Sequence, residues 1–297
     1  MNQASVGFQC PEELRGGGSG RSGGSGSADP ADRADRPSRT WARSGGGAAR
    51  QASNPARRVH SRFGGDPAHA GRPVVTQVLV ALCVLAYLLQ GAPGLGLAAS
   101  GSANRFTNRY FLDGFAIAEQ HQYYRLLTAA FLHASLLHIL FNMYALYLLG
   151  FQLEAALGRV RFLALFIVSS IGGSTLSFLV HGLQTSSLGA STGIFGMFAA
   201  YYLVARRMQV NTGPILIVVG INLLLTFFVA GIDKFGHIGG LITGAVIGVI
   251  LTMVPPRQRV LQGVLVGAVF VLLIVAVAIK VESLPSLFPS VPGGGNI

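Results

Sequence analysis

The sequence predicts an all-α polytopic membrane protein, and three observations support this prediction. Hydrophobic residues make up 51% of the 297 residues and charged residues only 11%, whereas about 25% charged residues is usual in a soluble domain. The mean hydropathy is +0.54. Seven apolar segments approach the ~20 residues that a helix needs to cross a bilayer, and they cover residues 74–97, 126–152, 159–181, 190–205, 213–230, 235–254 and 260–279.

Two of these segments depart from a simple span. The segment 126–152 is longer than one crossing requires, so we assign its first part, to about Ala134, to the preceding loop. That loop includes the amphipathic stretch 104–125 and would dip into the membrane edge. The segment 190–205 is short, so we expect it to begin below the outer surface.

The net charge of +11 indicates membrane topology and not nucleic-acid binding, because of where the charges lie. Residues 1–72 carry 11 arginines and 6 acidic residues among Gly, Ser and Pro. We expect them to form a disordered basic cytoplasmic tail, in which Phe63 is too isolated to join a core. Residues 282–297 are rich in Pro and Gly and predict a flexible C-terminal tail. No cleavable signal is expected, since the first apolar run begins only at Val74.

The basic residues that flank the apolar segments predict the orientation. A cytoplasmic N-terminus places ten basic residues near the inner ends of the segments and five near the outer ends. We therefore expect a plasma-membrane protein with the N-terminus inside and, after seven crossings, the C-terminus outside. The inner set is Arg57, Arg58, Arg62, Arg72, Arg159, Arg161, Arg206, Arg207, Arg257 and Arg259, and the outer set is Arg105, Arg109, Arg125, Lys234 and Lys280.

The run 189–196, Gly-Ala-Ser-Thr-Gly-Ile-Phe-Gly, opens an apolar segment with Ser191 between small residues. Small neighbours leave a hydroxyl accessible, and the free N–H groups of a first helical turn can receive developing negative charge. This pattern is typical of an acyl-transfer nucleophile. The alternative is that small residues simply let two membrane helices approach closely. His237 at the start of another apolar segment, with His138 and Asn142 on a third, favours the nucleophile.

Depth in the membrane brings these four residues to one level. In the expected orientation, at a rise of 1.5 Å per residue, Ser191 and His237 lie ~22 and ~26 Å above the inner boundary. His138 and Asn142 lie ~24 and ~18 Å above it on the same basis. In a hydrocarbon layer about 30 Å thick, all four fall in the outer half. Polar groups are costly at that depth unless they pair or line a wet cavity, so we expect one common site.

The chemistry of this site follows from the residue types. A neutral His237 imidazole can take the Ser191 proton as general base. His138 and Asn142 are four residues apart and share a helix face, so they would bind an oxyanion together with the Ser191 N–H. The acidic residue nearest this level is Asp233, which we place in a loop. The sequence therefore predicts a Ser–His dyad and not a triad.

Glycines predict how the two catalytic helices meet. Gly240, Gly244 and Gly248 repeat every four residues in the segment that carries His237, which is the small-residue pattern of close helix contact. Gly244 and Gly248 lie within ~20° of that histidine around the helix. We expect this glycine face to press against the helix that begins at Ser191 and so bring the imidazole to the hydroxyl.

Three other polar residues are expected to be structural. His133 lies on a different helix face from the oxyanion pair and would tie down the loop. Glu154 is expected to form an ion pair with Arg159 and Arg161 at the cytoplasmic boundary. Asn222 is expected to hydrogen-bond across neighbouring helices.

In this order, the motifs resemble the rhomboid family of intramembrane serine proteases over residues 74–256. The family's signature is a Tyr/Trp-Arg pair in the first loop, His-x4-His-x3-Asn on the second helix, Gly-x-Ser-x on the fourth and His followed by glycines on the sixth. The chain matches it with Tyr124-Arg125, with His133, His138 and Asn142, with Gly189-Ala190-Ser191-Thr192, with His237-Ile238-Gly239-Gly240, and with Glu154 and Gly158 after the second helix.

The resemblance implies a rhomboid-like six-helix catalytic bundle over residues 73–256 and an additional transmembrane helix at 257–281. It implies that Ser191 is the nucleophile and His237 the base, with Arg125 and Gly189 in structural positions. The implied reaction is hydrolysis of a peptide bond in or next to a transmembrane helix of a protein substrate, through an acyl-enzyme. No cofactor or metal is needed, and the expected partners are membrane-protein substrates and the lipid bilayer.

The chain also departs from the family pattern. Thr192 stands where Gly is commoner and is expected to narrow the room beside the nucleophile. Phe195 stands where some relatives have a Tyr stacked on the histidine. Residues 4–11 resemble the end of a zinc segment that precedes the membrane domain in some relatives, but Cys10 is one cysteine of the four needed, so no zinc is expected. Cys10 and Cys83 suggest no disulfide framework.

Other functions remain as alternatives to the protease. A catalytically inactive relative that acts as a membrane binding or quality-control protein is the main one, and the presence of both Ser191 and His237 argues against it. A soluble α/β-hydrolase would need a strand before the serine, which the flanking sequence does not supply. A transporter would be expected to show repeated half-sequences, and none is seen.

Overall fold

The structure is a computed structural model that describes residues 63, 72–95, 104–229 and 231–284. The expectations for the tails at 1–72 and 282–297 fall largely outside these residues and stay predictions. The expectation for residues 4–11 falls wholly outside them.

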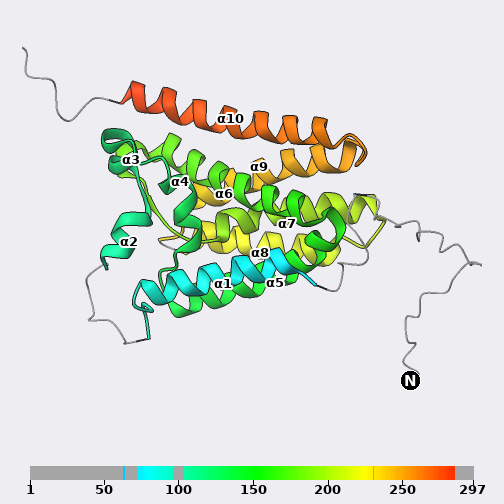
Figure 1. Cartoon of the computed structure of the whole chain (residues 1–297). Helices are drawn as coiled ribbons and strands as arrows, with labels where there is room; N and C mark the ends of the chain where they lie inside the picture. The colour runs from blue at the N-terminus through cyan, green and yellow to red at the C-terminus, as the bar shows by residue number, and fades with distance from the viewer. Residues whose placement is uncertain (1–62, 64–71, 96–103, 230, 285–297) are drawn as a thin grey trace, which may run out of the picture. The chain divides into compact units, whose positions relative to one another are not determined.

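The described part of the chain is helical apart from one short strand pair, as the predicted fold class requires (Figure 1). The strand pair joins Leu112–Asp113 to Ser186–Ser187 in antiparallel register and was not predicted. The elements are α1 (Val74–Leu89), α2 (Arg105–Tyr110), β1 (Leu112–Asp113), α3 (Gly114–Gln120), α4 (Arg125–Thr128), the 3-10 turn η2 (Ala129–Phe131), α5 (Leu136–Leu157), α6 (Arg159–His181), η3 (Gly182–Gln184), β2 (Ser186–Ser187), α7 (Ser191–Arg207), α8 (Gly213–Phe228), α9 (Lys234–Met253) and α10 (Arg259–Ser283).

Each apolar segment corresponds to one long helix, with two informative differences in the boundaries. α1 ends at Leu89, well before residue 97, because Gly91 and Gly94 adopt positive φ angles of 79° and 87° on either side of Pro93. The segment 126–152 divides as expected, since its first residues form α4 and η2 and α5 begins only at Leu136. In the described part, α5, α6 with η3, α9 and α10 are long and apolar enough to cross a membrane, whereas α1 and α8 are shorter apolar helices.

α6 is the central helix of the bundle. It contacts α5, α7, α9 and α10, and 67% of its most apolar stretch is buried, compared with 11% for α10. Its fully buried Phe162, Phe166 and Phe178 fill the core, and small residues such as Gly172 and Gly173 let the α9 backbone and side chains approach. α10 lies along the outside of the bundle beside α6 and α9 (Figure 1).

One core residue contradicts the sequence analysis. Phe63 was expected in a disordered tail, yet its side chain is 3% exposed and belongs to the largest buried cluster, together with Leu79 and Cys83 of α1. A single aromatic ring can be buried by helices far away in the sequence, and a flanking sequence of Gly, Ser and Arg gives no sign of this.

The glycine face of α9 lies directly against α7. A Cβ atom at Gly244 would overlap the backbone of Gly196, and one at Gly240 would overlap the carbonyl of Thr192. A turn further along, a Cβ atom at Gly248 would lie 3.0 Å from Cα of Ala200. α7 and α9 therefore run parallel at backbone contact, and their first turns lie side by side.

Candidate active site

Ser191 is the first residue of α7, after a turn that only glycine adopts easily. Gly189 has a φ of 139°, and its N–H donates to the Ala129 carbonyl at 2.9 Å, which fixes the turn to the loop before α5. The Ser191 side chain is half-buried. The hydroxyl thus projects from a rigid helix start that remains partly accessible.

The structure brings Ser191 and His237 together. The Ser191 hydroxyl lies 2.8 Å from Nε2 of His237, which is in the first turn of α9 and is 8% exposed. Asp233 caps this turn by accepting the Gly236 N–H at 2.8 Å. The Phe195 ring stacks on the imidazole, with ring centroids 4.3 Å apart and an interplanar angle of 18°. The helix cap and the stacked ring together hold the imidazole in its orientation.

A residue that the sequence analysis did not consider completes the hydrogen bonding of His237. Nδ1 of His237 lies 2.7 Å from the Thr226 hydroxyl on α8. The same hydroxyl lies 2.8 Å from the Asn222 carbonyl, to which it donates its one proton. Nδ1 must then carry the proton that bonds to Thr226, so Nε2 is left as the acceptor for Ser191. Asp233 is the N-cap of α9 and makes no hydrogen bond to the imidazole within the described residues.

His138 approaches the serine turn from α5 and packs against Gly189. A Cβ atom at Gly189 would lie 2.9 Å from Cε1 and Nε2 of this imidazole and 3.4 Å from the Ser191 hydroxyl. The Ala134 N–H donates to Nδ1 of His138 at 3.3 Å, so Nε2 carries the proton and faces the serine turn. Only a glycine at position 189 leaves room for this donor.

Asn142 lies one turn further along α5 and is 7% exposed. Its Nδ2 donates one proton to the His138 carbonyl at 2.8 Å, and the second amide proton remains for another acceptor. The shared helix face that the spacing predicted is therefore present, and one of the two amide donors is used within the helix.

Arg125 and His133 organise the loop before α5. The Arg125 guanidinium donates to the carbonyls of Asn108 and Phe111 at 2.9 Å each and to Oε1 of Gln122 at 2.7 Å. His133 was expected to tie down the loop. Its backbone N–H donates to Oε1 of Gln90 at 2.9 Å, while its two ring nitrogens have no hydrogen-bond partner among the described residues.

Glu154 corrects the sequence analysis in part. Its expected ion pair with Arg159 exists at 3.8 Å, but Arg161 bonds to Gln262 instead. The buried carboxylate mainly accepts the N–H groups of Val75 and Thr76 at 3.0 and 2.9 Å, and so caps the start of α1.

Two further expectations are also changed. The Asn222 amide donates to the Val218 carbonyl of its own helix, so it does not hydrogen-bond to a neighbouring helix among the described residues. The Thr192 side chain packs against Gly173 and Gly236, which supply the room that its methyl group takes up.

Comparison with known proteins places this arrangement in a family. A family model described as Rhomboid domain matches residues 120–254, which include all four residues of the expected site. Rhomboid protease GluP of Bacillus subtilis (strain 168) is 36% identical over 180 residues, covering 59% of this chain and 34% of GluP. Residues 120–254 therefore belong to the rhomboid family.

Plant relatives agree with this assignment. RHOMBOID-like protein 6, mitochondrial, of Arabidopsis thaliana is 32% identical over 150 residues, covering 48% of each chain. RHOMBOID-like protein 2 of the same plant is 34% identical over 150 residues, covering 48% of this chain and 47% of the relative. The present rhomboid chain thus spans between a third and a half of the length of these relatives. Its family and its long apolar helices make it a multi-pass membrane protein.

Thr226 could not have been found from the sequence by spacing or motif. It is one hydroxyl in an otherwise apolar helix, and such residues commonly bond back to their own helix, as Thr226 also does. Its 3% exposure next to exposed Phe227 and Leu225 is the feature that sets it apart, and burial is visible only in the folded rhomboid domain.

Proposed function

We propose that this rhomboid is an intramembrane serine endopeptidase that hydrolyses a peptide bond in or next to a transmembrane helix of a protein substrate. The observation that supports the proposal most directly is the 2.8 Å contact between the Ser191 hydroxyl and Nε2 of His237. A serine paired with a neutral imidazole, itself held by a third group, is the arrangement of an activated nucleophile.

In the first half of the proposed reaction, Ser191 Oγ attacks the substrate carbonyl carbon while Nε2 of His237 takes the hydroxyl proton. The carbonyl electron pair moves to the oxygen and gives a tetrahedral oxyanion. When this collapses, the C–N bond breaks, and His237 passes its proton to the leaving amine nitrogen. The product is an ester between the substrate acyl group and Ser191.

In the second half, water attacks the ester carbon and gives its proton to Nε2 of His237. Collapse of the second oxyanion breaks the bond to Ser191 Oγ, which takes the proton back from the imidazole. The carboxylic acid leaves, and the enzyme returns to its starting state. The Thr226 hydroxyl keeps the Nδ1–H bonded throughout, so the ring does not need to reorient between the two halves.

The oxyanion would be bound by three donors at the serine turn. These are the N–H of Ser191 at the helix start, the Nε2–H of His138 and the second amide proton of Asn142. Removing a single donor of this type typically costs ~10²–10³ in rate. In the proposed orientation, with the N-terminus inside, the starts of α5, α7 and α9 face the outer side, which is where water would enter.

Labelling with an activity-based probe tests the proposal. A fluorophosphonate, which phosphonylates activated serines with loss of fluoride, is added to the detergent-solubilised full-length chain, to Ser191→Ala and to His237→Ala. We expect labelling of the wild type, no labelling of either variant, and cleavage of a model transmembrane substrate in the same pattern. GluP is named a protease, which supports the proposal. A folded wild-type protein that neither labels nor cleaves would instead support the inactive membrane-binding alternative.

A further inference from the structure

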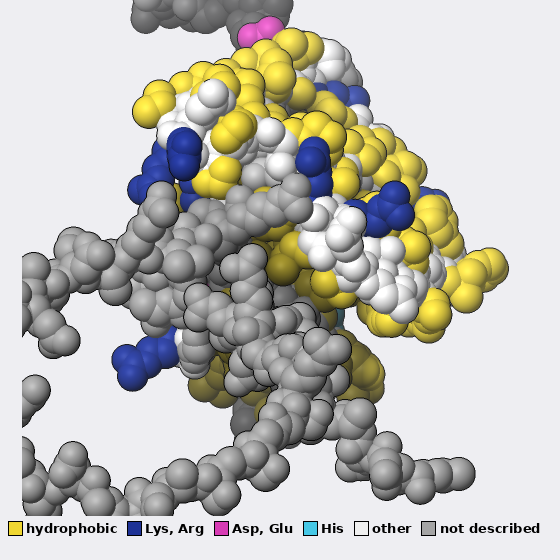
Figure 2. All heavy atoms as spheres, turned by 90° about the vertical axis from the view of Figure 1, so that its right-hand side faces the viewer, with side chains coloured by type: hydrophobic (Ala, Val, Ile, Leu, Met, Phe, Trp, Pro, Cys, Tyr) yellow, Lys and Arg dark blue, Asp and Glu magenta, His cyan; other side chains and the backbone are white. Residues whose placement is uncertain are grey.

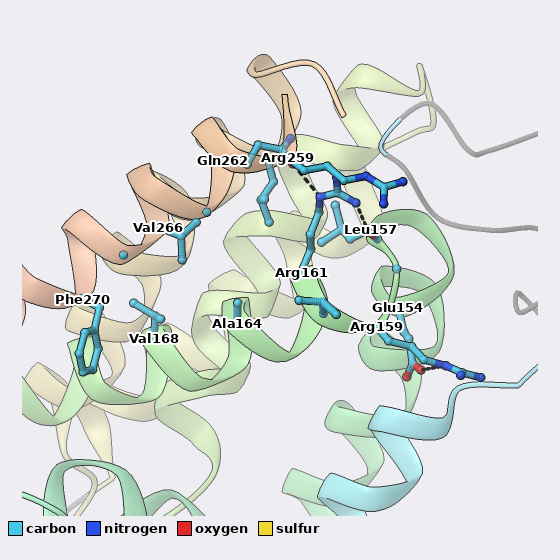
Figure 3. A pocket seen from close by; sticks show the side chains of 15 residues that line it. Glu154, Leu157, Arg159, Arg161, Ala164, Val168, Arg259, Gln262, Val266 and Phe270 are labelled. Carbon is cyan, nitrogen blue, oxygen red and sulfur yellow. Dashed lines mark hydrogen bonds and ion pairs between the residues drawn. The ribbon is translucent and has the colours of Figure 1, made fainter. Parts of the chain in front are cut away.

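A groove lies between α6 and α10, at the opposite end of the bundle from the serine. It has a volume of about 760 Å³, within the usual range of ~300–1,000 Å³ for small-molecule pockets. Val266 and Phe270 of α10 face Ala164 and Val168 of α6 across it (Figure 3). α10 is the least buried of the four long apolar helices within the described residues, so much of its surface is left to face lipid in a membrane.

One end of the groove is strongly basic. Arg159, Arg161 and Arg259 line it, and Glu154 is the acidic residue among the lining groups. That carboxylate already accepts hydrogen bonds at the start of α1. Arg259 and Arg159 are exposed, and the Arg161 guanidinium is held in place by Gln262 and by the carbonyl of Pro256 (Figure 3). Glu154 forms its ion pair with Arg159, on the side away from the other two arginines (Figure 3). Arg161 and Arg259 are therefore left as positive charge for an anion.

Two helix starts reinforce this charge. α6 begins at Arg159 and α10 at Arg259, neither has a side-chain cap, and neither has an acidic residue in its first turn. The N-terminal ends of both helices thus add partial positive charge at the same mouth. Lys and Arg side chains spread over this end of the bundle among hydrophobic ones (Figure 2).

The rest of the groove is apolar, and the groove as a whole has about the length of one membrane leaflet. From Arg259 to Phe270 the α10 axis rises ~16 Å at 1.5 Å per residue. Half of a hydrocarbon layer of about 30 Å is ~15 Å. Gly263 and Gly267 line the α10 wall, and a Cβ atom at either would meet nothing within 4 Å. The two glycines leave open the space in which a chain of methylene groups can lie.

We propose that the α6–α10 groove binds an anionic phospholipid, with its phosphate at Arg161 and Arg259 and one acyl chain along Gly263 and Gly267. A guanidinium fork binds phosphate oxygens in bidentate fashion. The basic end of the groove fits an anionic head group, and its apolar stretch fits an acyl chain. An amphiphilic anion therefore fits the groove better than a free anion or an apolar partner helix. The site also gives α10, which is extra to the six-helix bundle, a role in holding lipid against α6.

Native mass spectrometry of the full-length chain in detergent tests this proposal. The probes are dioleoylphosphatidylglycerol, dioleoylphosphatidylcholine with the same acyl chains, and inorganic phosphate. We expect the anionic lipid to bind at least about fivefold more tightly than the zwitterionic one, and inorganic phosphate to leave the bound lipid in place. Thermal unfolding should shift upward with the anionic lipid and not with phosphate.

Matched variants distinguish binding in the groove from general attraction of an anionic lipid to the positively charged protein. Arg259→Gln should weaken phosphatidylglycerol binding about fivefold, whereas Arg206→Gln, at the same end but outside the groove, should not. Gly267→Leu should weaken binding of both lipids, because the leucine side chain would fill the space along the α10 wall in which an acyl chain lies. Gly220→Leu on α8 is its control, since a Cβ atom there also meets nothing within 4 Å.

Three results would overturn the proposal. Equal loss in Arg206→Gln and Arg259→Gln would mean that only net charge matters. Displacement of the lipid by inorganic phosphate, with Gly267→Leu unchanged, would mean a free-anion site. A groove substitution that changes the mass of the oligomer and leaves lipid binding intact would mean that a second copy covers the groove. If Gly267→Leu fails to fold, the comparison of Arg259→Gln with Arg206→Gln still decides the outcome.

Discussion

The Thr226 hydroxyl lies 2.7 Å from Nδ1 of His237, on the far side of the imidazole from Ser191. In serine hydrolases with a triad, a carboxylate occupies this place, where it fixes the tautomer and stabilises the imidazolium. A hydroxyl can do only the first, because it carries no charge. The proposed dyad thus has a neutral positioning partner supplied by α8.

Thr226→Val keeps the shape of this side chain and removes the hydroxyl. It leaves a buried Nδ1–H unpaired, which costs about 1–3 kcal/mol. We expect the rate of fluorophosphonate labelling to fall by roughly 5- to 150-fold, and the melting temperature to fall as well, because the unpaired group is buried. Thr226→Ser should restore most of the rate. If the valine variant labels at the wild-type rate, Thr226 only packs against the ring.

Gly244→Leu tests whether backbone contact between α7 and α9 sets the dyad geometry. Any Cβ atom at position 244 overlaps the backbone of Gly196, so the helices must separate. Overpacking of this kind costs typically 1–3 kcal/mol or more. We expect loss of labelling although both side chains of the proposed dyad remain, and a lower melting temperature. Gly220→Leu, where the added side chain meets open space, is the control. Full labelling by Gly244→Leu would contradict this packing argument.

Sequence could predict the parts of this site that depend on helix periodicity and membrane depth. Ser191, His237 and His138 lie within the first four residues of α7, α9 and α5. Membrane helices of similar length with the same direction must carry their first turns to one level. The glycine spacing on α9 predicts the close contact for the same reason. Side-chain contacts between helices that are distant in the sequence, such as Thr226 with His237 and Glu154 with α1, leave no periodic pattern in the sequence. They depend on which helices are neighbours in the bundle, and only the folded structure shows this.

Glu154→Gln tests one such contact between helices, the cap that α5 supplies to α1. The carboxylate accepts the N–H groups of Val75 and Thr76 on separate oxygens. An amide would turn its NH₂ group toward one of these donors and leave it unpaired. We expect the free energy of unfolding to fall by about 1–3 kcal/mol, measured as a lower melting temperature in detergent. Glu282→Gln, at an exposed position on α10, should have no effect. Equal melting of the two variants would show that the cap of α1 is not needed.

His133 gives a prediction about pH. It lies before α5, outside the long membrane helices, with a fully buried ring whose two nitrogens have no hydrogen-bond partner among the described residues. Burial, and to a smaller extent the nearby His138, lowers the pKa of His133 from 6.5 to about 3. Between these two values the unfolded chain binds a proton that the folded chain does not. The stability therefore falls as the pH drops below 6.5, by about 2 kcal/mol at about pH 5.

His133→Leu removes this titration and fills a similar volume with an apolar side chain. We expect the wild type to lose about 2 kcal/mol more stability than the variant when the pH is lowered from about 7 to about 5. Melting curves of both proteins at the two pH values measure the difference. The variant should also keep fluorophosphonate labelling, because the site does not use the His133 ring. A variant that loses labelling while still folded would place this ring in the chemistry, and identical pH dependence would mean that the ring is protonated or hydrated in the folded protein.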